Sequence, residues 1–316
     1  MKAKNFALVG AAGYIALRHF KAIKETGNQI TAILDKSDSV GIIDSYFPNA
    51  AFFTEAERFD RHLYRCFREH SDSKIDYVSI CSPNYLHDAH IRMALRNGAD
   101  AICEKPLVLN PWNLEGLEKI EQDTGKNIFH ILQLRLHPAI IKLKSAIDNQ
   151  PDDKIYNIDL TYITSRGTWY LYSWKGDDEK SGGITTNIGS HFFDMLTYIF
   201  GDVQDIKIHY ATPITVAGFL QLKKARVRWF LSIDNKQLPQ TVAAEGKTSY
   251  RSLTIDNQEF DFSDGFTDLH TLSYQNILSG SGFRIADAYQ YVTLCHDIRS
   301  RKPEGLKGDY HPFLKK

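Results

Sequence analysis

Residues 5–16 read Asn5-Phe-Ala-Leu-Val-Gly10-Ala-Ala-Gly13-Tyr-Ile-Ala16, a short apolar run followed by a glycine turn and a helical pattern. This order predicts the dinucleotide-binding turn of a Rossmann fold, where a pyrophosphate meets a helix N-terminus. Gly10 suits the tight turn, Gly13 suits close approach of the pyrophosphate to the backbone, and Ala16 suits close packing of helix on strand. Because Ala12 occupies the second glycine position of the usual motif, a plain strand-to-helix turn is the alternative.

The alternation of apolar runs and helical patterns continues through about residue 110. Further runs at Gln29–Leu34, Tyr77–Cys81 and Ala101–Cys103 predict a parallel sheet with crossover helices, whose functional residues collect at the carboxyl ends of the strands. Asp35 ends the second run, where a carboxylate accepts ribose hydroxyls and repels a ribose phosphate. This position favours NAD over NADP, although the neighbouring Lys36 weakens the argument.

Two other strand ends carry unusual side chains, in Ser82-Pro-Asn84-Tyr-Leu-His87 and in Glu104-Lys105-Pro106. A lysine at the rim of a buried sheet is costly unless it is paired, and beside Glu104 and a nicotinamide it can bind a substrate hydroxyl and assist loss of its proton. Taken alone, Lys105 would be interpreted as a solvated turn residue. Asn84 and His87 alone would be interpreted as helix-start and capping residues.

The pattern changes after about Pro138. A helix to Asn149 is followed by five strand-like runs and three more helical patterns, and together these predict an open, largely antiparallel sheet with helices on one face. The runs are 154–165, 205–211, 215–222, 225–233 and 250–255, and the helical patterns are 188–200, 267–278 and 285–299. We therefore expect an α/β chain with a dinucleotide-binding domain at 1–134 and a second domain at 135–316. The free face of the second sheet predicts a homo-oligomer.

Polar residues gather at the start of the predicted helix 188–200. Asn187, His191 and Asp194 come after Gly182-Gly183. They are four and three residues apart, so on one helix their side chains would share a face. His191 can take up a proton near neutral pH, and Asp194 either orients it or supports the fold.

Aromatic and cationic residues are dense in residues 161–177. Arg166 and Lys175 can neutralise carboxylate or phosphate groups, while Trp169 and Tyr170 can stack on a sugar or base. Core packing is the alternative for the aromatic residues. Weaker candidates of the same kind are Arg135 and His137, and the stretch 266–270 is interpreted as a helix start.

Composition excludes several classes of protein. The 316 residues contain 38 Lys plus Arg and 38 Asp plus Glu, so no global charge predicts binding to nucleic acid or to an anionic membrane. The four cysteines form no CxxC pair, which indicates neither a metal site nor a disulfide framework. Without a signal-peptide pattern or a long apolar stretch, we expect a soluble cytoplasmic protein.

Taken in order, these motifs resemble the Gfo/Idh/MocA oxidoreductase family over nearly the whole chain. The resemblance also includes Gln133-Leu-Arg135-Leu-His137-Pro. It implies a Rossmann domain that holds NAD or NADP, a second domain with an open sheet for oligomerisation, and a lysine and a histidine that act on a sugar or cyclitol hydroxyl, here Lys105 and His191. The family often has an aspartate where this chain has Asn187, and this leaves His191 as general base.

Within the family, the chain resembles the UDP-N-acetyl-2-amino-2-deoxyglucuronate 3-dehydrogenases of lipopolysaccharide O-antigen biosynthesis. The resemblance is carried by residues 5–16, 39–45, 159–167, 173–177, 185–189 and 265–270. It implies oxidation of a UDP-hexuronate at C3 by tightly held NAD, with 2-oxoglutarate able to recycle the NADH. The sequence leaves open whether the expected homo-oligomer is a dimer or a tetramer. The alternatives are a dehydrogenase of another sugar or cyclitol and a non-catalytic NAD-binding sensor.

These arguments yield two sets of site residues. We predict cofactor contacts from Gly10, Ala12, Gly13, Tyr14, Ile15, Asp35, Ser82, Asn84, His87, Glu104, Lys105 and Gln133. We predict substrate contacts from Lys105, Arg166, Trp169, Tyr170, Lys175, Asn187 and His191, with Lys105 and His191 catalytic.

Overall fold

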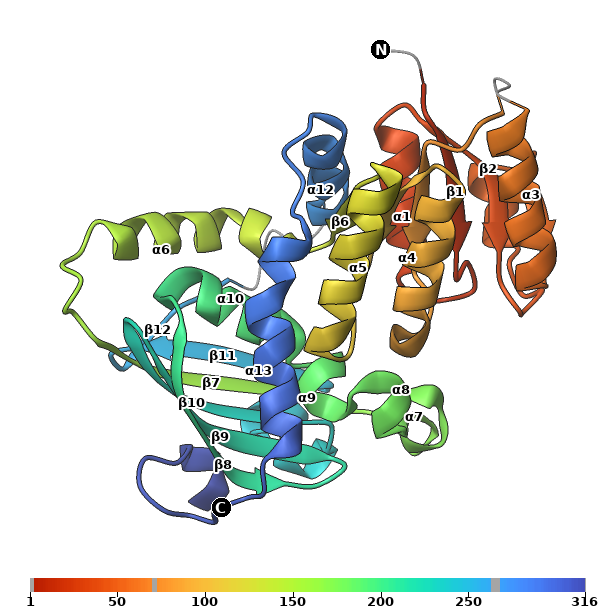
Figure 1. Ribbon diagram of the computed structural model, residues 1–316. Helices are drawn as coiled ribbons and strands as arrows, with labels where there is room; N and C mark the ends of the chain where they lie inside the picture. The colour runs from red at the N-terminus through yellow and green to blue at the C-terminus, as the bar shows by residue number, and fades with distance from the viewer. Residues whose placement is uncertain (1–2, 70–72, 263–267, 316) are drawn as a thin grey trace. The chain divides into compact units, whose positions relative to one another are not determined.

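Strand β1 (Asn5–Val9) lies inside a six-stranded sheet, and all of its residues are buried. The computed structural model describes residues 3–69, 73–262 and 268–315 (Figure 1). The strand order is β3-β2-β1-β4-β5-β6, and each neighbouring pair is parallel, which confirms the predicted Rossmann sheet. The loops after β1 and β4 leave the sheet where the strand order reverses, which is where such sheets bind ligands.

Helices cross between these strands as the sequence pattern predicts. The remaining strands are β2 (Gln29–Leu34), β3 (Ala51–Phe53), β4 (Tyr77–Ile80), β5 (Asp100–Cys103) and β6 (Ile128–His130). The helices are α1 (Ala16–Glu25), α2 (Ile42–Tyr46), α3 (Ala56–Arg68), α4 (His87–Arg96) and α5 (Pro111–Thr124). Within the sequence Asn127-Ile-Phe-His-Ile-Leu132, only the three residues of β6 form a strand.

The chain divides into two compact units, and the first unit is not continuous in sequence. It comprises Met1–Gln133 and Thr267–Tyr289, and the second comprises Leu134–Phe266 and Gln290–Lys316. The returning segment contributes helix α12 (Leu269–Leu278), which packs against α1 through the rings of Tyr274 and His19. A division at residue 134 therefore describes the start of the second unit but omits this return.

The second unit contains the other sheet, with strand order β12-β11-β7-β10-β9-β8. Its β7–β10 pair is parallel and its other pairs are antiparallel, which confirms a largely antiparallel sheet. The strands are β7 (Tyr156–Thr164), β8 (Val203–Ala211), β9 (Thr215–Leu222), β10 (Ala225–Ser232), β11 (Ser249–Ile255) and β12 (Gln258–Glu259). The helices are α6 (Pro138–Asp148), α7 (Trp169–Tyr172), α8 (Asp178–Ser181), α9 (Gly183–Asn187), α10 (Ser190–Phe200), α11 (Gln240–Ala244) and α13 (Tyr289–Ser300).

Successive residues of β10 point to opposite faces of this sheet. Trp229 is fully buried and meets the ring of Phe193 from α10 edge to face, with the centroids 5.2 Å apart. The next residue, Phe230, meets Phe313 from the C-terminal segment at 5.5 Å. The α10 face is therefore the main core of the unit, and the opposite face has a smaller apolar cluster.

The C-terminal residues of the chain cover part of the sheet face that was expected to pack against another subunit. His311 is buried beside Phe230, and its Nε2 lies 3.1 Å from the Thr161 hydroxyl on β7. The rings of Phe313 and Tyr250 stack in parallel 6.2 Å apart. The free surface of this sheet is consequently smaller than the strand pattern alone predicts.

The predicted helix 188–200 is present as α10 but begins two residues later, at Ser190. Helix α9 ends at Asn187 and α10 begins at Ser190, with Gly189 between them. A Cβ on Gly189 would lie 2.4 Å from the Thr185 carbonyl oxygen and 2.7 Å from a Leu231 methyl carbon, so this close approach to the sheet requires glycine. Asn187 and His191 therefore lie on different helices, and the expectation of one shared helix face is wrong for Asn187.

Among the described residues, no helix has the length and apolar character needed to cross a bilayer.

Candidate active site

The glycine loop after β1 passes very close to the end of β4. Gly10 has φ of +92°, and a Cβ there would lie 2.6 Å from the carbonyl carbon of Cys81 and 2.7 Å from the amide nitrogen of Ser82. A side chain at residue 10 would therefore force the two strand ends apart. At Gly13 a Cβ would lie 3.1 Å from the Gly10 carbonyl oxygen, so both glycines keep the backbone of the loop open to a pyrophosphate.

Asp35 fixes this loop to the end of β2. Its carboxylate accepts hydrogen bonds from the amide nitrogens of Ala12 at 2.8 Å and Ser37 at 2.9 Å. A carboxylate oxygen has two acceptor sites, so each can still accept a ribose hydroxyl. In the same loop, Tyr14 is 90% exposed, while Ile15 packs against the core of the unit.

The end of β4 is braced by His87, whose two ring nitrogens meet backbone carbonyls. Nδ1 lies 2.7 Å from the Pro106 oxygen and Nε2 lies 2.8 Å from the Ser82 oxygen. Burial lowers the pKa of His87, and the two carbonyl acceptors oppose that shift. The ring thus joins the loops after β4 and β5, while its cofactor contact stays a prediction.

The nearby polar side chains are mostly buried. The Ser82 hydroxyl lies 2.9 Å from His90 Nδ1, and Asn84 is buried at the start of the one-turn helix 84–86. Gln133, the last residue of the first stretch of this unit, has a buried Oε1 without a hydrogen-bond partner among the described residues. Since orphaned buried acceptors are rare in proteins, this atom suits a donor on a bound ligand.

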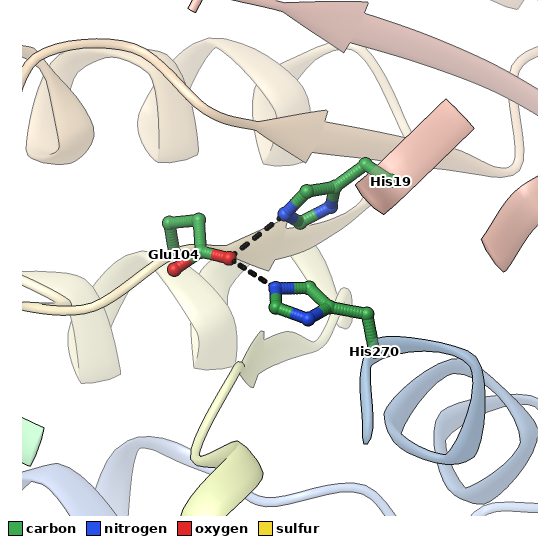
Figure 2. A group of neighbouring side chains, drawn as sticks. All are labelled: His19, Glu104 and His270. Carbon is green, nitrogen blue, oxygen red and sulfur yellow. Dashed lines mark hydrogen bonds and ion pairs between the residues drawn. The ribbon is translucent and has the colours of Figure 1, made fainter. Parts of the chain in front are cut away.

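Glu104 forms the centre of a buried cluster at the end of β5, shown in Figure 2. Its Oε1 accepts hydrogen bonds from His19 Nε2 at 2.9 Å and His270 Nε2 at 2.8 Å. Burial alone would raise the pKa of Glu104, but the hydrogen bonds from the two histidines hold it well below its usual range. Its Oε2 accepts the backbone N–H of Lys105 at 3.2 Å, and the Lys105–Pro106 peptide bond is cis.

Sequence reasoning did not assign His19 or His270 to a site. His19 lies on the apolar face of α1 with Ala16, Phe20 and Ile23, where a fully buried polar residue requires a partner. The position of His19 on this apolar face can be recognised from the sequence and predicts that the side chain has a buried partner. His270 lies in the stretch 266–270 that was expected to begin a helix, and its burial becomes apparent only with α12 in place. Residues 266 and 267 of that stretch lie outside the described residues, which resume at Asp268.

In the second unit, Asn187 contacts one of the predicted substrate residues. Its Nδ2 donates to the hydroxyl of Tyr170 at 2.7 Å, and burial raises the pKa of Tyr170. His191 lies one residue into α10 and is partly exposed. The structure therefore brings Asn187 and Tyr170 together, and it places the partly exposed His191 at the start of the next helix.

Lys175 lies between two indole rings. Its Nζ is 4.7 Å from the Trp174 ring centroid and 5.5 Å from that of Trp169. Burial lowers the pKa of Lys175, and the positive charge of Arg166 lowers it further. Two cations that repel one another are stabilised by a bound anion, so these residues suit a carboxylate or phosphate.

Arg135 and Asp194 form a buried ion pair in the second unit. Arg135 Nη2 donates to Asp194 Oδ1 at 2.6 Å, and Nε lies 3.2 Å from both carboxylate oxygens. The guanidinium also lies over the ring of Tyr198 at 4.7 Å. Asp194 thus supports the fold, and Arg135 is neutralised internally. The weaker candidate His137 caps α6 through its Nδ1.

The first unit fits a dinucleotide. The backbone cradle at Gly10 and Gly13, the carboxylate of Asp35 and the orphaned Gln133 acceptor would hold pyrophosphate, ribose and amide groups in turn. NAD, when bound, supplies a hydride acceptor. Fold and site together define a nicotinamide-dependent oxidoreductase.

Comparison with known proteins identifies the family. The description "Oxidoreductase family, NAD-binding Rossmann fold" fits residues 4–131, and "Oxidoreductase family, C-terminal alpha/beta domain" fits residues 144–238. The chain belongs to the Gfo/Idh/MocA family of oxidoreductases, and its cofactor is NAD.

Solved structures similar to the whole chain include a WlbA (WbpB) dehydrogenase from Thermus thermophilus in complex with NAD and alpha-ketoglutarate. That protein is 46% identical, with 98% of this chain and 100% of that chain covered and a TM-score of 0.95. Its complex with NAD and UDP-GlcNAcA gives 45% identity over 98% and 100% of the two chains, with a TM-score of 0.94. The WlbA dehydrogenase from Bordetella pertussis shares the fold at 20% identity, with a TM-score of 0.76 over 94% and 95% of the chains.

Curated relatives match over shorter stretches. Inositol 2-dehydrogenase from Rhizobium meliloti (strain 1021) is 29% identical over 203 residues, which are 63% of this chain and 55% of that protein. The chain therefore spans about half the length of this relative.

Replacing Asp35 with Asn should weaken NADH binding about tenfold and raise the affinity for NADPH relative to NADH, because the charge that repels a ribose phosphate is removed. Fluorescence titration with both nucleotides measures the ratio. Asp38→Asn, which changes an exposed acid three residues away, serves as control. An unchanged ratio in Asp35→Asn would contradict the ribose assignment.

Replacing Asp194 with Ala should destabilise the second unit by about 3–5 kcal/mol, because the Arg135 guanidinium is left buried and unpaired. Denaturant unfolding measures the loss. The double variant Arg135→Met/Asp194→Leu should recover most of it, since no charge is then buried alone. Full stability with abolished turnover in Asp194→Ala would instead indicate a direct role beside His191.

Proposed function

We propose that this protein oxidises the C3 hydroxyl of UDP-N-acetyl-2-amino-2-deoxy-D-glucuronate to the 3-keto sugar, with NAD as hydride acceptor. One observation carries the proposal: over its full length, a dehydrogenase solved with NAD and UDP-GlcNAcA is 45% identical to this chain. The resemblance of residues 5–16, 159–167 and 185–189 to O-antigen enzymes places the reaction in lipopolysaccharide sugar biosynthesis as part of the same proposal.

The proposed chemistry needs one group to hold the hydroxyl and another to take its proton. Lys105 follows the anionic Glu104, and its ammonium would donate a hydrogen bond to the C3 oxygen. The accessible imidazole of His191 would accept the hydroxyl proton as hydride leaves C3. Asn187 cannot accept a proton, and its bond to Tyr170 gives it a positioning role.

The charged part of the substrate suits the second unit. Lys175 and Arg166 would neutralise the uronate carboxylate or the diphosphate, and the exposed face of Trp169 would stack on a ring of the nucleotide sugar. The same cations suit the carboxylates of 2-oxoglutarate, which we propose as the oxidant that restores NAD. The complex of a 46% identical dehydrogenase with alpha-ketoglutarate supports this part of the proposal.

The proposal includes a homo-oligomer and a reducing, cytoplasmic location. Two observations support it: the second sheet has a small apolar cluster on the face that holds Phe230, and the four cysteines are buried and form no disulfide.

An alternative is oxidation of a different sugar or cyclitol. Two relatives support this alternative: inositol 2-dehydrogenase and D-glucoside 3-dehydrogenase are 29% and 28% identical to part of the chain.

Purified protein incubated with UDP-N-acetylglucosaminuronic acid should convert it to a product lighter by two hydrogens. Mass spectrometry of the nucleotide sugar and absorbance of reduced nicotinamide follow the reaction, with and without 2-oxoglutarate. Product that accumulates beyond one equivalent only with 2-oxoglutarate would support recycling. Turnover of myo-inositol or free glucosides, with none of the UDP sugar, would favour the alternative.

Lys105→Met and His191→Asn should each lower kcat at least about a hundredfold while NADH binding is retained, because each removes one partner of the reacting hydroxyl. Steady-state kinetics and fluorescence titration provide the two measurements. Lys142→Met on α6 and His62→Asn on α3 are matched controls outside the proposed site. Near-normal turnover of either active-site variant would remove that residue from the mechanism.

A further inference from the structure

The buried cluster of Glu104, His19 and His270 takes no part in the chemistry proposed above. Glu104 directly follows β5, His19 lies on α1 and His270 lies on α12, and the three side chains meet inside the first unit, as Figure 2 shows. His19 is fully buried, and Glu104 and His270 are each 5% exposed. Burying this many titratable groups is costly unless they satisfy one another, so their arrangement requires an explanation.

The hydrogen positions in the cluster follow from the charge of Glu104. A carboxylate only accepts, so Nε2 of both histidines must carry a proton. Burial lowers the pKa of His19, and the neutral ring therefore accepts at Nδ1 from the Tyr274 hydroxyl at 2.7 Å. Tyr274 in turn accepts from the Ser79 hydroxyl at 2.6 Å. The Ser79 hydroxyl, the Tyr274 hydroxyl and the His19 ring then each donate to the next group, and the series ends at the Glu104 carboxylate, which only accepts.

In this arrangement both oxygens of the Glu104 carboxylate, which is next in sequence to Lys105, are engaged. Oε1 of Glu104 is occupied by the two histidines, and Oε2 accepts the backbone N–H of Lys105 at 3.2 Å. The carboxylate therefore cannot rotate without losing a donor. The carboxylate thus connects His19 on α1 and His270 on α12 to the backbone N–H of Lys105.

We propose that His19 and His270 are positioning residues, which hold the Glu104 carboxylate in one orientation and thereby fix Lys105 for its substrate hydroxyl. The catalytic part of this inference rests on the proposed function. The two histidines act through Glu104, and the return of the chain through α12 supplies one of them.

The same side chains could in principle bind a metal, because their ligand atoms all lie within 4.8 Å of one another. The distances favour hydrogen bonds. Both nitrogens lie at 2.8–2.9 Å from a single carboxylate oxygen, and His19 Nδ1 is also engaged by Tyr274. A closed zinc site would need a fourth ligand in addition to these three.

The test compares His270→Leu, which removes the donor, with His270→Gln, whose amide N–H can replace Nε2–H. His270→Leu should lower kcat at least about tenfold with KM for the UDP sugar and NADH affinity changed less than about threefold. Hydrogen–deuterium exchange of the peptide spanning 100–107 should become faster in the substrate-free protein. His270→Gln should restore most of both properties, and His62→Leu on α3 is the control for loss of a histidine.

Glu104→Gln keeps the test decisive if His270→Leu does not fold. If the oxygen of the introduced amide accepts from the two histidines, its NH₂ group faces the Lys105 N–H. Two donors then meet and the hydrogen bond to Lys105 is lost, so kcat should fall and hydrogen–deuterium exchange of residues 100–107 should become faster. Unchanged kcat and exchange in folded His270→Leu or Glu104→Gln would overturn the proposal, as would stoichiometric zinc in the purified protein. If wild-type protein fails to oxidise the UDP sugar, the proposed function is wrong. Hydrogen–deuterium exchange of residues 100–107 in the substrate-free protein still tests whether the two histidines restrain the backbone at Lys105.

Discussion

The close backbone contact between Gly10 and the end of β4 is the constraint on which the first unit depends. A Cβ at residue 10 would lie 2.6 Å from Cys81, so β1 and β4 can pair as neighbours only because this position has no side chain. Their pairing creates the reversal of strand order, and all the parallel strands then end at one edge of the sheet. Asp35, Ser82 and Glu104 follow three of those strands, and the loop chemistry is therefore a consequence of the sheet.

Local patterns predicted the strands well. β1, β2 and β9 have the predicted bounds, because each is a mainly apolar run of strand-forming residues. The sequence analysis did not assign β3 or α3. β3 has only three residues at the sheet edge, which is too short to show a period. α3 buries Phe59, Leu63 and Cys66 at helical spacings of four and three, so its pattern is present in the sequence and was overlooked among the charged neighbours. The break at Gly189 depends on contact with β10, which no local pattern contains.

The site was predictable where it depends on strand ends and unpredictable where it depends on distant pairs. Lys105 and Asp35 follow from the rule that ligands bind at the carboxyl edge of a parallel sheet. The partners of Glu104 are 85 and 166 residues away in sequence, and Arg135 is 59 residues from Asp194. Only the fold reveals that His19 and His270 share one carboxylate, or that Asp194 neutralises Arg135. Burial of a polar residue on an apolar helix face predicts that a partner exists, but not which one.

The discontinuous first unit restricts how members of this family can exchange parts. Helix α12 carries His270 and Tyr274 into the cluster around Glu104, although it follows the whole strand series of the second unit in the chain. A single genetic crossover near residue 134 would join a cofactor unit to another protein's α12, and the carboxylate would meet unfamiliar neighbours. Recombination that preserves the cluster therefore needs a second crossover near residue 266, before α12. The second unit is itself divided, because its residues 290–316 follow the returning segment, so exchange of the whole unit needs a third crossover near residue 289. A new substrate unit can then be acquired without disturbing the neighbours of Glu104.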